Sequence, residues 1–492
     1  MIEVCVTRQA PTTVLLAALL LLAIPLVAAA VGLLPSDYYE FEFVSELQKA
    51  PDGNTVAFVR STISEDRRSR ESAIWLVATD GSSPPRQFTR DSSDPSPRWS
   101  PDGRQLAFIS RRQDRSQLHL IPLGGGEAHA VTQLEQGSIV GFEWLPDNRH
   151  VLLSLRIDPA VEDPDQKAAE ETGPKPNLKR SPNAVYTSDD GGYLDESRVG
   201  LWLLDSEGPS LQRLTGHADW NDRNATVSPD GTLIAFDADR RGGEYAGGFN
   251  LDIFLLTLET AEVWRLETPS GRAWQPTFSP DGRQIYFHHQ SERYAPTTLQ
   301  PIAVGGGGAD VMHDGLALTA TDVGIPAAGQ GSFLRADSGG ARPLFRLDRS
   351  GRAIPLVGAD ATINGVSFSA NGRQMAYVEE DETCLAEIFT ARSDGSRVRQ
   401  LARFNDELLG QRELQSLERF TFTNEEDMAA DGFLLRPLGF REGQRFLGAV
   451  TRRSVSNWIS EAGTQEYPPE SMTAQFGGTI WPTSTTTGVA RR

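Results

Sequence analysis

The chain has 492 residues, enough for two to four domains and an ample hydrophobic core, so a small scaffold that depends on disulfides is excluded. It carries 66 acidic against 47 basic residues, a formal net charge of −19, and this acidic field disfavours nucleic acid as a partner. The two cysteines, Cys5 and Cys384, lie on opposite sides of the strongly apolar segment, so we expect neither a disulfide framework nor a cysteine metal site.

The first predicted element is the apolar segment Val14–Leu34, whose 21 uncharged residues are long enough to cross a hydrocarbon core of about 30 Å. Arg8 precedes it and acidic residues follow it, so the positive-inside rule places the rest of the chain outside the cytoplasm. Small residues at Ala28 and Ala30 also fit a cleavage site. We expect residues 1–35 to be a signal peptide or an N-terminal membrane anchor, and the protein to be exported, either anchored on the extracytoplasmic face or secreted or periplasmic.

A turn motif then recurs along the chain, in which Ser-Pro-Asp-Gly is followed by two polar residues and a short apolar run. Ser first, Pro second and Gly fourth fit a type I turn, and the β-rich run after the turn fits a strand. Each copy therefore predicts a hairpin. The clearest copies are WSPDGRQLAFIS from Trp99, VSPDGTLIAFDA from Val227 and FSPDGRQIYFHH from Phe278, with weaker copies at Lys49, Trp144 and Phe368.

A second hairpin follows each first one, as in IWLVATDGSSPPRQFT from Ile74 and IFTARSDGSRVRQL from Ile388. Four strands repeated at roughly 40–50 residues are typical of a β-propeller. Counting the poorer copies, we predict seven blades within residues 36–404. The interval between Pro146 and Pro229 is too long for one repeat, and its polar, proline-containing residues 158–180 are predicted to be an exposed insertion in blade three.

The stretch ERFTFTNEEDMAADGFLLRPLGFREGQRF, from Glu418 to Phe446, follows the last repeat and alternates as two strands about a polar turn. Together with the PD40-type repeats, it resembles the S9 (prolyl oligopeptidase-like) serine peptidases, in particular the dipeptidyl aminopeptidase and acylaminoacyl peptidase branch. The resemblance implies a propeller that caps a C-terminal α/β hydrolase and restricts access to short peptides. It assigns residues 405–446 to the first hairpin of the hydrolase domain.

The family pattern breaks after Phe446. The chain continues as LGAVTRRSVSNWISEAGTQEYPPESMTAQFGGTIWP, which resembles the family's sequence downstream of the nucleophile elbow, so the oxyanion loop and the elbow are missing. Residues 447–492 are expected to be a poorly ordered hydrolase remnant. A true in-frame deletion and an error of gene prediction both explain the junction.

The chemistry agrees with this interpretation. An α/β hydrolase needs a Ser on a G-x-S-x-G turn, followed along the chain by an acid and a His. No G-x-S-x-G occurs, and the last of the seven histidines is His313. Ser454 and Ser456 therefore lack the base that would activate them and are not expected to be nucleophiles. We predict no catalytic, cofactor-binding or metal-binding residues in this chain.

Other motifs have ordinary structural interpretations. His288 and His289 are adjacent on a predicted strand, so they face opposite ways, one inward and one outward, and cannot share a metal. The remaining motifs are predicted to be turns at Asp91–Asp94 and Asp189–Asp190, a solvated hairpin tip at Glu425–Asp427, a linker at Gly305–Gly308, and a glycosylation sequon by pattern only at Asn224–Thr226.

The sequence thus predicts an all-β, seven-bladed β-propeller with a truncated α/β-hydrolase remnant at its C-terminus. The function that follows is that of an exported S9-like peptidase homologue, non-catalytic as written, which takes peptides or a protein partner in the propeller funnel. Attachment to a membrane would use residues 14–34. The alternative is a TolB-like propeller that serves as a binding or interaction module. The two hypotheses differ at residues 418–482, because a pure binding propeller has no reason to carry a hydrolase-like hairpin.

Overall fold

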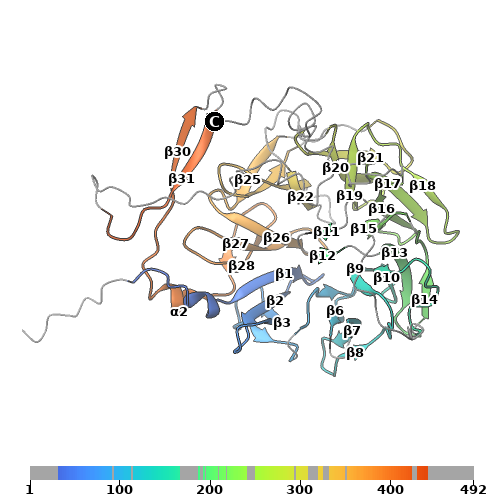
Figure 1. Ribbon diagram of the computed structural model, residues 1–492, viewed down its shortest axis with the longest axis horizontal. Coiled ribbons are helices and arrows are strands. Elements are labelled where there is room, and N and C mark those ends of the chain that lie inside the picture. Colours follow the sequence, from blue (N-terminus) through green and yellow to red (C-terminus); the bar gives the residue numbers. More distant parts are fainter. Residues whose placement is uncertain are drawn as a thin grey trace, which may run out of the picture.

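Seven antiparallel sheets are arranged as blades around a central axis (Figure 1). The computed structural model describes residues 31–440 apart from internal gaps, of which the longest are 167–186, 241–249, 309–319 and 325–331. The prediction of a nearly all-β propeller with seven blades is confirmed.

The blades follow one another along the chain, and the first strand of each lies innermost (Figure 1). Blade 1 contains β1 (Phe43–Lys49), β2 (Thr55–Ile63), β3 (Arg70–Ala78) and β4 (Arg86–Gln87); blade 2 contains β5 (Arg98–Trp99), β6 (Gln105–Ser110), β7 (Gln117–Pro122) and β8 (His129–Ala130); blade 3 contains β9 (Ser138–Trp144), β10 (His150–Ile157), β13 (Arg198–Asp205) and β14 (Ser210–Arg213). Blade 4 contains β15 (Asp222–Val227), β16 (Leu233–Ala238), β17 (Asp252–Thr257) and β18 (Val263–Arg265); blade 5 contains β19 (Arg272–Phe278), β20 (Gln284–Gln290) and β21 (Thr298–Ala303). Blade 6 contains β22 (Ala320–Gly324), β23 (Ser332–Ala336), β24 (Leu344–Leu347) and β25 (Ala353–Val357); blade 7 contains β26 (Thr362–Phe368), β27 (Gln374–Glu380), β28 (Glu387–Arg392) and β29 (Arg399–Gln400).

The hydrophobic core is distributed around the ring. Each joint between neighbouring blades holds one cluster of buried apolar side chains. Middle strands are continuous apolar runs, such as LAFI in β6 and IFLL in β17, because both faces of a blade are covered by its neighbours. Phe58, Phe108 and Phe236 illustrate this, since each lies on the second strand of its blade and is fully buried.

One end of the propeller, which we call the turn face, carries the turns between first and second strands. In the turns that begin at Ser100, Ser228 and Ser279, the glycine N–H donates to the serine carbonyl at 2.8, 2.8 and 2.9 Å. The glycines have φ of +70°, +74° and +69°, and a Cβ on Gly231 would lie 3.2 Å from Cδ of Pro146 in the preceding blade. The predicted turns are confirmed, and this glycine is required by both its backbone and its neighbour.

The ring closes without exchange of strands, since no blade contains a strand from the segment of another blade; the pair β11–β12 interrupts blade 3 but belongs to no blade. Blades 1 and 7 meet through one hydrophobic cluster and a polar clasp. In the clasp, the Glu42 N–H donates to Asn405 Oδ1 and Asn405 Nδ2 donates to the Glu42 carbonyl, both at 2.9 Å. Beyond it, Arg412 donates to both carboxylate oxygens of Asp37 at 2.6 and 2.7 Å. The segments before β1, including the 3-10 helix η1 (Asp37–Tyr39), and after β29, including α2 (Asp406–Leu409), are thereby held together.

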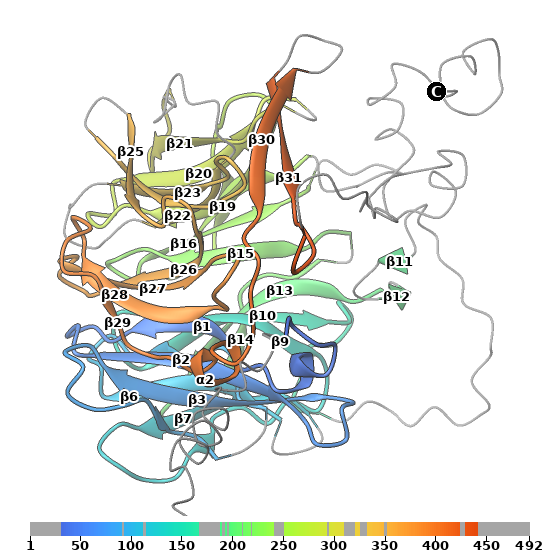
Figure 2. The same cartoon turned by 90° about the vertical axis from the view of Figure 1, so that its left-hand side faces the viewer.

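The opposite end, which we call the mouth face, is where the chain enters and leaves the propeller. The insertion of blade 3 departs there, between β10 and β13 (Figure 2). Its described start runs along the outside of the blade, because Arg213 of β14 donates to the Pro159 carbonyl and the Glu135 N–H donates to the Pro164 carbonyl. Most of the predicted insertion lies outside the described residues, as does its continuation up to the short pair β11 (Thr187–Ser188) and β12 (Gly192–Tyr193).

A separate hairpin follows the last blade, formed by β30 (Glu418–Thr423) and β31 (Ala429–Leu434) (Figure 2). The two predicted strands are confirmed. The predicted hydrolase remnant is not visible in the described part of the chain beyond this hairpin, and residues 447–492 lie outside it. Within the described residues no helix is long and apolar enough to span a membrane, and nearly all of Val14–Leu34 lies outside them.

Candidate functional site

The inner wall of the propeller is irregular. Six of the seven innermost strands carry a β-bulge, in which extra residues oppose one residue of the second strand. The bulge residues Glu46, Asn224 and Gln275 have left-handed backbones, with φ of 51°, 50° and 52°. Such strain in non-glycine residues concentrates at ligand-binding positions, and bulges redirect side chains. The inner wall is therefore the first candidate for a binding surface.

One buried carboxylate holds two of these bulges. Asp237 Oδ2, on β16, accepts hydrogen bonds from Asn224 Nδ2 at 2.7 Å and from the Gln275 N–H at 2.9 Å. The Asp237 side chain is fully buried, and burial raises its pKa. Because Asn224 belongs to blade 4 and Gln275 to blade 5, this single group sets the inner wall across a joint.

A cavity of about 220 Å³ opens beside these bulges. Its wall combines apolar surface with hydroxyl, amide and imidazole groups, from Asn224, Ala225, Thr226, Gln275, Pro276, Thr277, Tyr286, His288 and Leu299. This mixture suits a peptide, which presents amide groups and apolar side chains together.

Charged groups extend this wall toward blades 1 to 3. Burial raises the pKa of Glu143 on β9 to about 7, although Arg98 of blade 2 and a hydrogen bond from Thr226 oppose the shift. Burial also lowers the pKa of the Arg98 guanidinium, which Glu46 and Glu143 partly restore. Blades 1, 2 and 3 thus contribute an acid, a base and an acid in turn: Glu46, Arg98 and Glu143.

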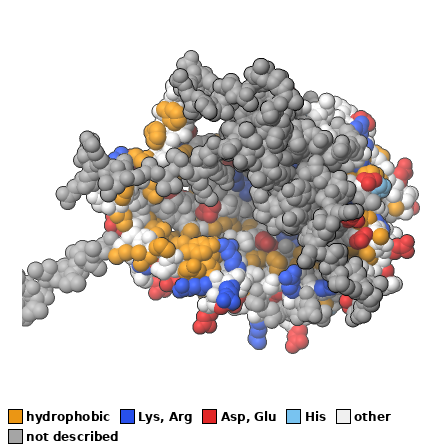
Figure 3. All heavy atoms as spheres, in the orientation of Figure 1, with side chains coloured by type: hydrophobic (Ala, Val, Ile, Leu, Met, Phe, Trp, Pro, Cys, Tyr) orange, Lys and Arg blue, Asp and Glu red, His pale blue; other side chains and the backbone are white. Residues whose placement is uncertain are grey.

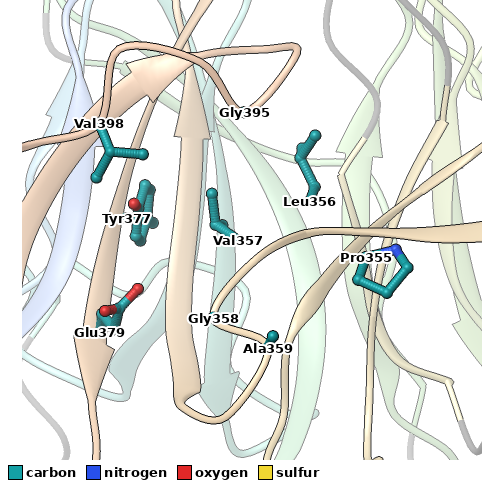
Figure 4. Close-up of a pocket in the computed structure, with 9 residues that line it drawn as sticks. All are labelled: Pro355, Leu356, Val357, Gly358, Ala359, Tyr377, Glu379, Gly395 and Val398. Atoms are coloured by element: carbon teal, nitrogen blue, oxygen red, sulfur yellow. The ribbon is translucent and has the colours of Figure 1, made fainter.

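A second cavity, of about 310 Å³, lies in the groove between blades 6 and 7 (Figure 4). Tyr377 and Glu379 lie one above the other on β27, with Val357 of β25 beside them (Figure 4). Burial raises the pKa of both side chains. This cavity is lined in part by the outermost strand of blade 6 and by none of the left-handed bulge residues, so we do not assign the function to it.

The two adjacent histidines differ from expectation in one respect. They face opposite sides of β20, but both are buried, with exposures of 3% and 5%, so the prediction that one points outward is wrong. The reason is that both faces of a blade are covered. His288 packs on Trp274, whereas His289 Nε2 donates to the Ser270 carbonyl and Nδ1 accepts from Gln300 Nε2, each at 3.0 Å. No group of three potential metal ligands occurs within the described residues.

The other motifs fall into two groups. Gly305–Gly308, predicted to be a linker, begins in the turn after β21, where the Gly306 N–H donates to the Ala303 carbonyl, and continues without regular structure. The sequon residue Asn224 lies on the inner wall, and its amide donates to Asp237. The others lie outside the described residues wholly or in part: Asp91, Asp189–Asp190, Glu425–Asp427, Ser454 and Ser456. Of the first turn, Asp94 is described and is fully buried.

Sequence reasoning did not find the inner-wall site. Asn224 and Gln275 each lie four residues before the serine of a Ser-Pro-Asp-Gly motif. An alignment of the repeats could therefore have marked them as equivalent positions. Their left-handed backbones and their shared partner Asp237 carry no local sequence signal.

The fold and inner wall define a seven-bladed propeller whose end blades do not exchange strands. No protein-family model matches the chain. Its relatives are S9-type peptidases: it is 33% identical over 199 residues to the uncharacterized peptidase YuxL of Bacillus subtilis, and 26% identical over 279 residues to dipeptidyl-peptidase 5 of Porphyromonas gingivalis. These matches cover 40% and 51% of this chain but only 29% and 38% of the relatives.

Solved structures show the same fold. The acylaminoacyl peptidase of Pyrococcus horikoshii has a TM-score of 0.65 at 18% identity, over 83% of this chain and 60% of that protein. The propeller domain of the Trilobed protease from Pyrococcus furiosus, described as having an open velcro topology, has a TM-score of 0.54 at 17% identity, over 75% of this chain and 98% of that domain. The expected resemblance to S9-type peptidases is confirmed for the propeller region.

Proposed function

We propose that this chain is an exported homologue of S9-type serine peptidases, of the acylaminoacyl or dipeptidyl peptidase type, whose propeller admits and binds short peptides. The observation that carries the proposal is the strained inner wall of blades 4 and 5, where Asp237 holds two bulges beside a cavity of about 220 Å³. Export rests on the apolar segment Val14–Leu34 alone.

The hairpin after blade 7 supports the link to a hydrolase domain. It is the segment that resembles the start of that domain, and its apolar side chains are exposed: Phe420 by 51%, Phe422 by 49%, Phe433 by 46% and Leu435 by 58%. Figure 3 shows hydrophobic side chains gathered in this region. An exposed apolar surface of this kind suits packing against a further domain or a hydrolase remnant.

We further propose that these 492 residues have no peptidase activity of their own, because they contain no G-x-S-x-G and no histidine after His313. A serine without a positioned base is a weak nucleophile.

The test measures binding and cleavage together. Purified protein is titrated into dansyl-labelled peptides of four to eight residues, and the same mixtures are followed by mass spectrometry. We expect binding with a Kd of roughly 10–100 μM, no cleavage, and no labelling by a fluorophosphonate probe. Ala225→Phe, which fills the cavity, should weaken binding at least tenfold, whereas Ala130→Phe, on the exposed outer strand β8, should not.

Peptide turnover would contradict the non-catalytic part of the proposal. Peptide binding that is equal in wild type and Ala225→Phe would contradict the assignment of the site. Binding of a folded protein without any affinity for peptides would favour the TolB-like interaction module instead.

A further inference from the structure

The segment that leads into blade 1 is bonded to the propeller from its first described residue. The Glu413 N–H donates to the Val31 carbonyl at 3.1 Å, and the Leu34 N–H donates to Asp37 Oδ2 at 2.8 Å. Arg412 holds Asp37 in turn, and the segment lies beside α2 at the rim of the ring (Figure 1). The end of the predicted anchor segment is therefore attached directly to the propeller.

Exposed tyrosines and arginines, which we call the rim patch, lie next to this attachment: Tyr38, Tyr39, Arg67 and Arg70. The tyrosines of η1 are 47% and 39% exposed. Arg70 Nη2 donates to the Tyr38 hydroxyl at 3.3 Å, and Cζ of Arg67 lies 4.3 Å from the ring centre of Tyr39. Arg67 precedes β3 and Arg70 begins it, so the rim patch lies at the mouth-face edge of blade 1.

The side chains of the rim patch suit the boundary between lipid and water. Tyrosine joins an apolar ring to a polar hydroxyl and is enriched at membrane interfaces. Arginine lays its stem along apolar surface while its guanidinium reaches phosphate oxygens. Leu33 and Leu34, which are 50% and 45% exposed, extend the patch with purely apolar surface.

The charges around the rim patch balance one another. Exposed acids and exposed arginines alternate in the connection between β2 and β3 and at the start of β3: Glu65, Asp66, Arg67, Arg68, Arg70 and Glu71. A strongly charged partner of either sign therefore has no electrostatic advantage here. A zwitterionic lipid surface meets no such requirement.

The short spacing along the chain keeps the rim patch close to the predicted anchor. Four residues separate Leu34 from Tyr38, which limits their separation to about 14 Å even when fully extended. The Asp37 N–H donates to the Leu34 carbonyl at 3.0 Å, and the turn that this bond closes shortens the distance further. The headgroup layer on each side of a bilayer is roughly 5–7 Å thick, so an anchor that ends at Leu34 brings Tyr38 to the membrane surface.

We propose that the rim patch rests in the headgroup layer of the membrane, so that the propeller docks on the lipid surface by the mouth-face edge of blade 1. Tyr38 and Tyr39 lie at the boundary of the apolar layer, and Arg67 and Arg70 contact lipid phosphates. The inference goes beyond the proposed peptide binding and rests on the proposed export, with Val14–Leu34 retained as an anchor.

The experiment measures how close the rim patch lies to lipid. The full chain, with Cys5→Ser and Cys384→Ser, is reconstituted into vesicles of phosphatidylcholine and phosphatidylethanolamine that contain a lipid with a nitroxide on its headgroup. Arg68→Cys carries an NBD fluorophore beside the rim patch and leaves its four side chains in place. Arg104→Cys is the matched control, because Arg104 is a highly exposed arginine on the turn face. We expect the nitroxide to quench the label at 68 at least about twofold more than the label at 104.

Two double variants then test the tyrosines, with the label kept at 68. Tyr38→Ser/Tyr39→Ser should lower the quenching to the level seen at 104, because the apolar rings that enter the interface are gone. Phe420→Ser/Phe422→Ser is the control: it removes two similarly exposed rings from β30, at 51% and 49%, and should leave the quenching unchanged. Thermal unfolding verifies that each variant is folded.

The outcomes separate this inference from the proposed function. A chain that inserts into vesicles but shows equal quenching at 68 and 104 would overturn the docking surface and keep both export and peptide binding. Quenching at 68 that survives in the tyrosine variant, or is lost only in the phenylalanine variant, would also overturn it. A chain that does not insert at all would overturn the membrane anchor together with the docking surface, while peptide binding is tested separately.

Discussion

The turn face and the mouth face of the propeller differ in where their hydrogen bonds come from. On the turn face the hydrogen bonds that shape each motif are local: Ser100, Ser228 and Ser279 donate to the aspartate two residues later at 2.7, 2.6 and 2.6 Å. Additional bonds join neighbouring turns, as where the Asp102 N–H donates to Asn148 Oδ1 at 2.7 Å. On the mouth-face side, single groups connect segments distant in sequence, as Asp237 does for Asn224 and Gln275. Local motifs can be repeated without change, whereas shared partners allow each joint to differ. The comparison places the repeated framework on one face and the surface that we propose binds peptides toward the other.

The largest expected effect comes from removing the Asp237 carboxylate, which two bulges share. Asp237→Ala leaves the Asn224 amide and the Gln275 N–H without their acceptor inside the protein, so we expect a loss of about 3 kcal/mol in the free energy of unfolding. Asp230→Ala, in an exposed turn, removes hydrogen bonds from Ser228 and Thr232 and should cost about 1 kcal/mol. Urea unfolding measures both. Equal losses would remove the distinction between the two faces.

The second prediction concerns pH. Burial raises the pKa of Glu387, in the joint between blades 1 and 7, from its usual 4.5 to about 7. In the unfolded chain this carboxyl ionises near 4.5, so between pH 4.5 and 7 the folded state holds more protons, and the free energy of unfolding must fall as pH rises through this window. We expect Glu387 to contribute roughly 2 kcal/mol to that fall, which levels off above the folded pKa.

Urea unfolding at intervals from pH 5 to 8 tests this slope. Glu387→Gln should flatten it, because the neutral amide does not titrate. Glu418→Gln is the control: the hydrogen bond from Arg436 lowers the pKa of Glu418, so its removal should leave the slope above pH 5 unchanged. A slope unaffected by Glu387→Gln would contradict the prediction.

The smallest expected effect on stability comes from replacing a glycine on the turn face. Gly231→Ala places a Cβ at φ +74° and 3.2 Å from Pro146, so we expect a loss of about 1 kcal/mol. Gly124→Ala, in the β7–β8 turn, meets no atom within 4 Å and should change stability by less than about 0.5 kcal/mol. Thermal unfolding of the two variants distinguishes them. A similar shift for both would show that the packing between neighbouring turns contributes nothing.

Much of the framework could be predicted because its signals are short in sequence. The turn beginning at Ser100 needs only Ser, Pro, Asp and Gly in order, and the apolar run after it forms the second strand of blade 2. Seven repeats of such local instructions are enough to predict seven blades. The same logic predicted the hairpin of β30 and β31.

The site could not be predicted in the same way. Asn224 lies in a sequon, and nothing in that pattern indicates that its amide donates to an aspartate 13 residues away. His288 and His289 were expected to differ in exposure, because strand alternation normally gives one buried and one solvated face. In a blade enclosed on both sides, that rule fails, and only the arrangement of neighbours reveals it.

The amino-acid sequence by itself determined the turns, the strands, their grouping into seven repeats and the resemblance to S9-type peptidases, because each depends on residues close together along the chain. The tertiary structure decided which groups meet across the joints: the Asp237 carboxylate with two bulges, and Glu42 with Asn405 in the clasp. The physical reason is that hydrogen bonds and charge interactions depend on distance in space, and closing a ring brings together residues as far apart as 42 and 405.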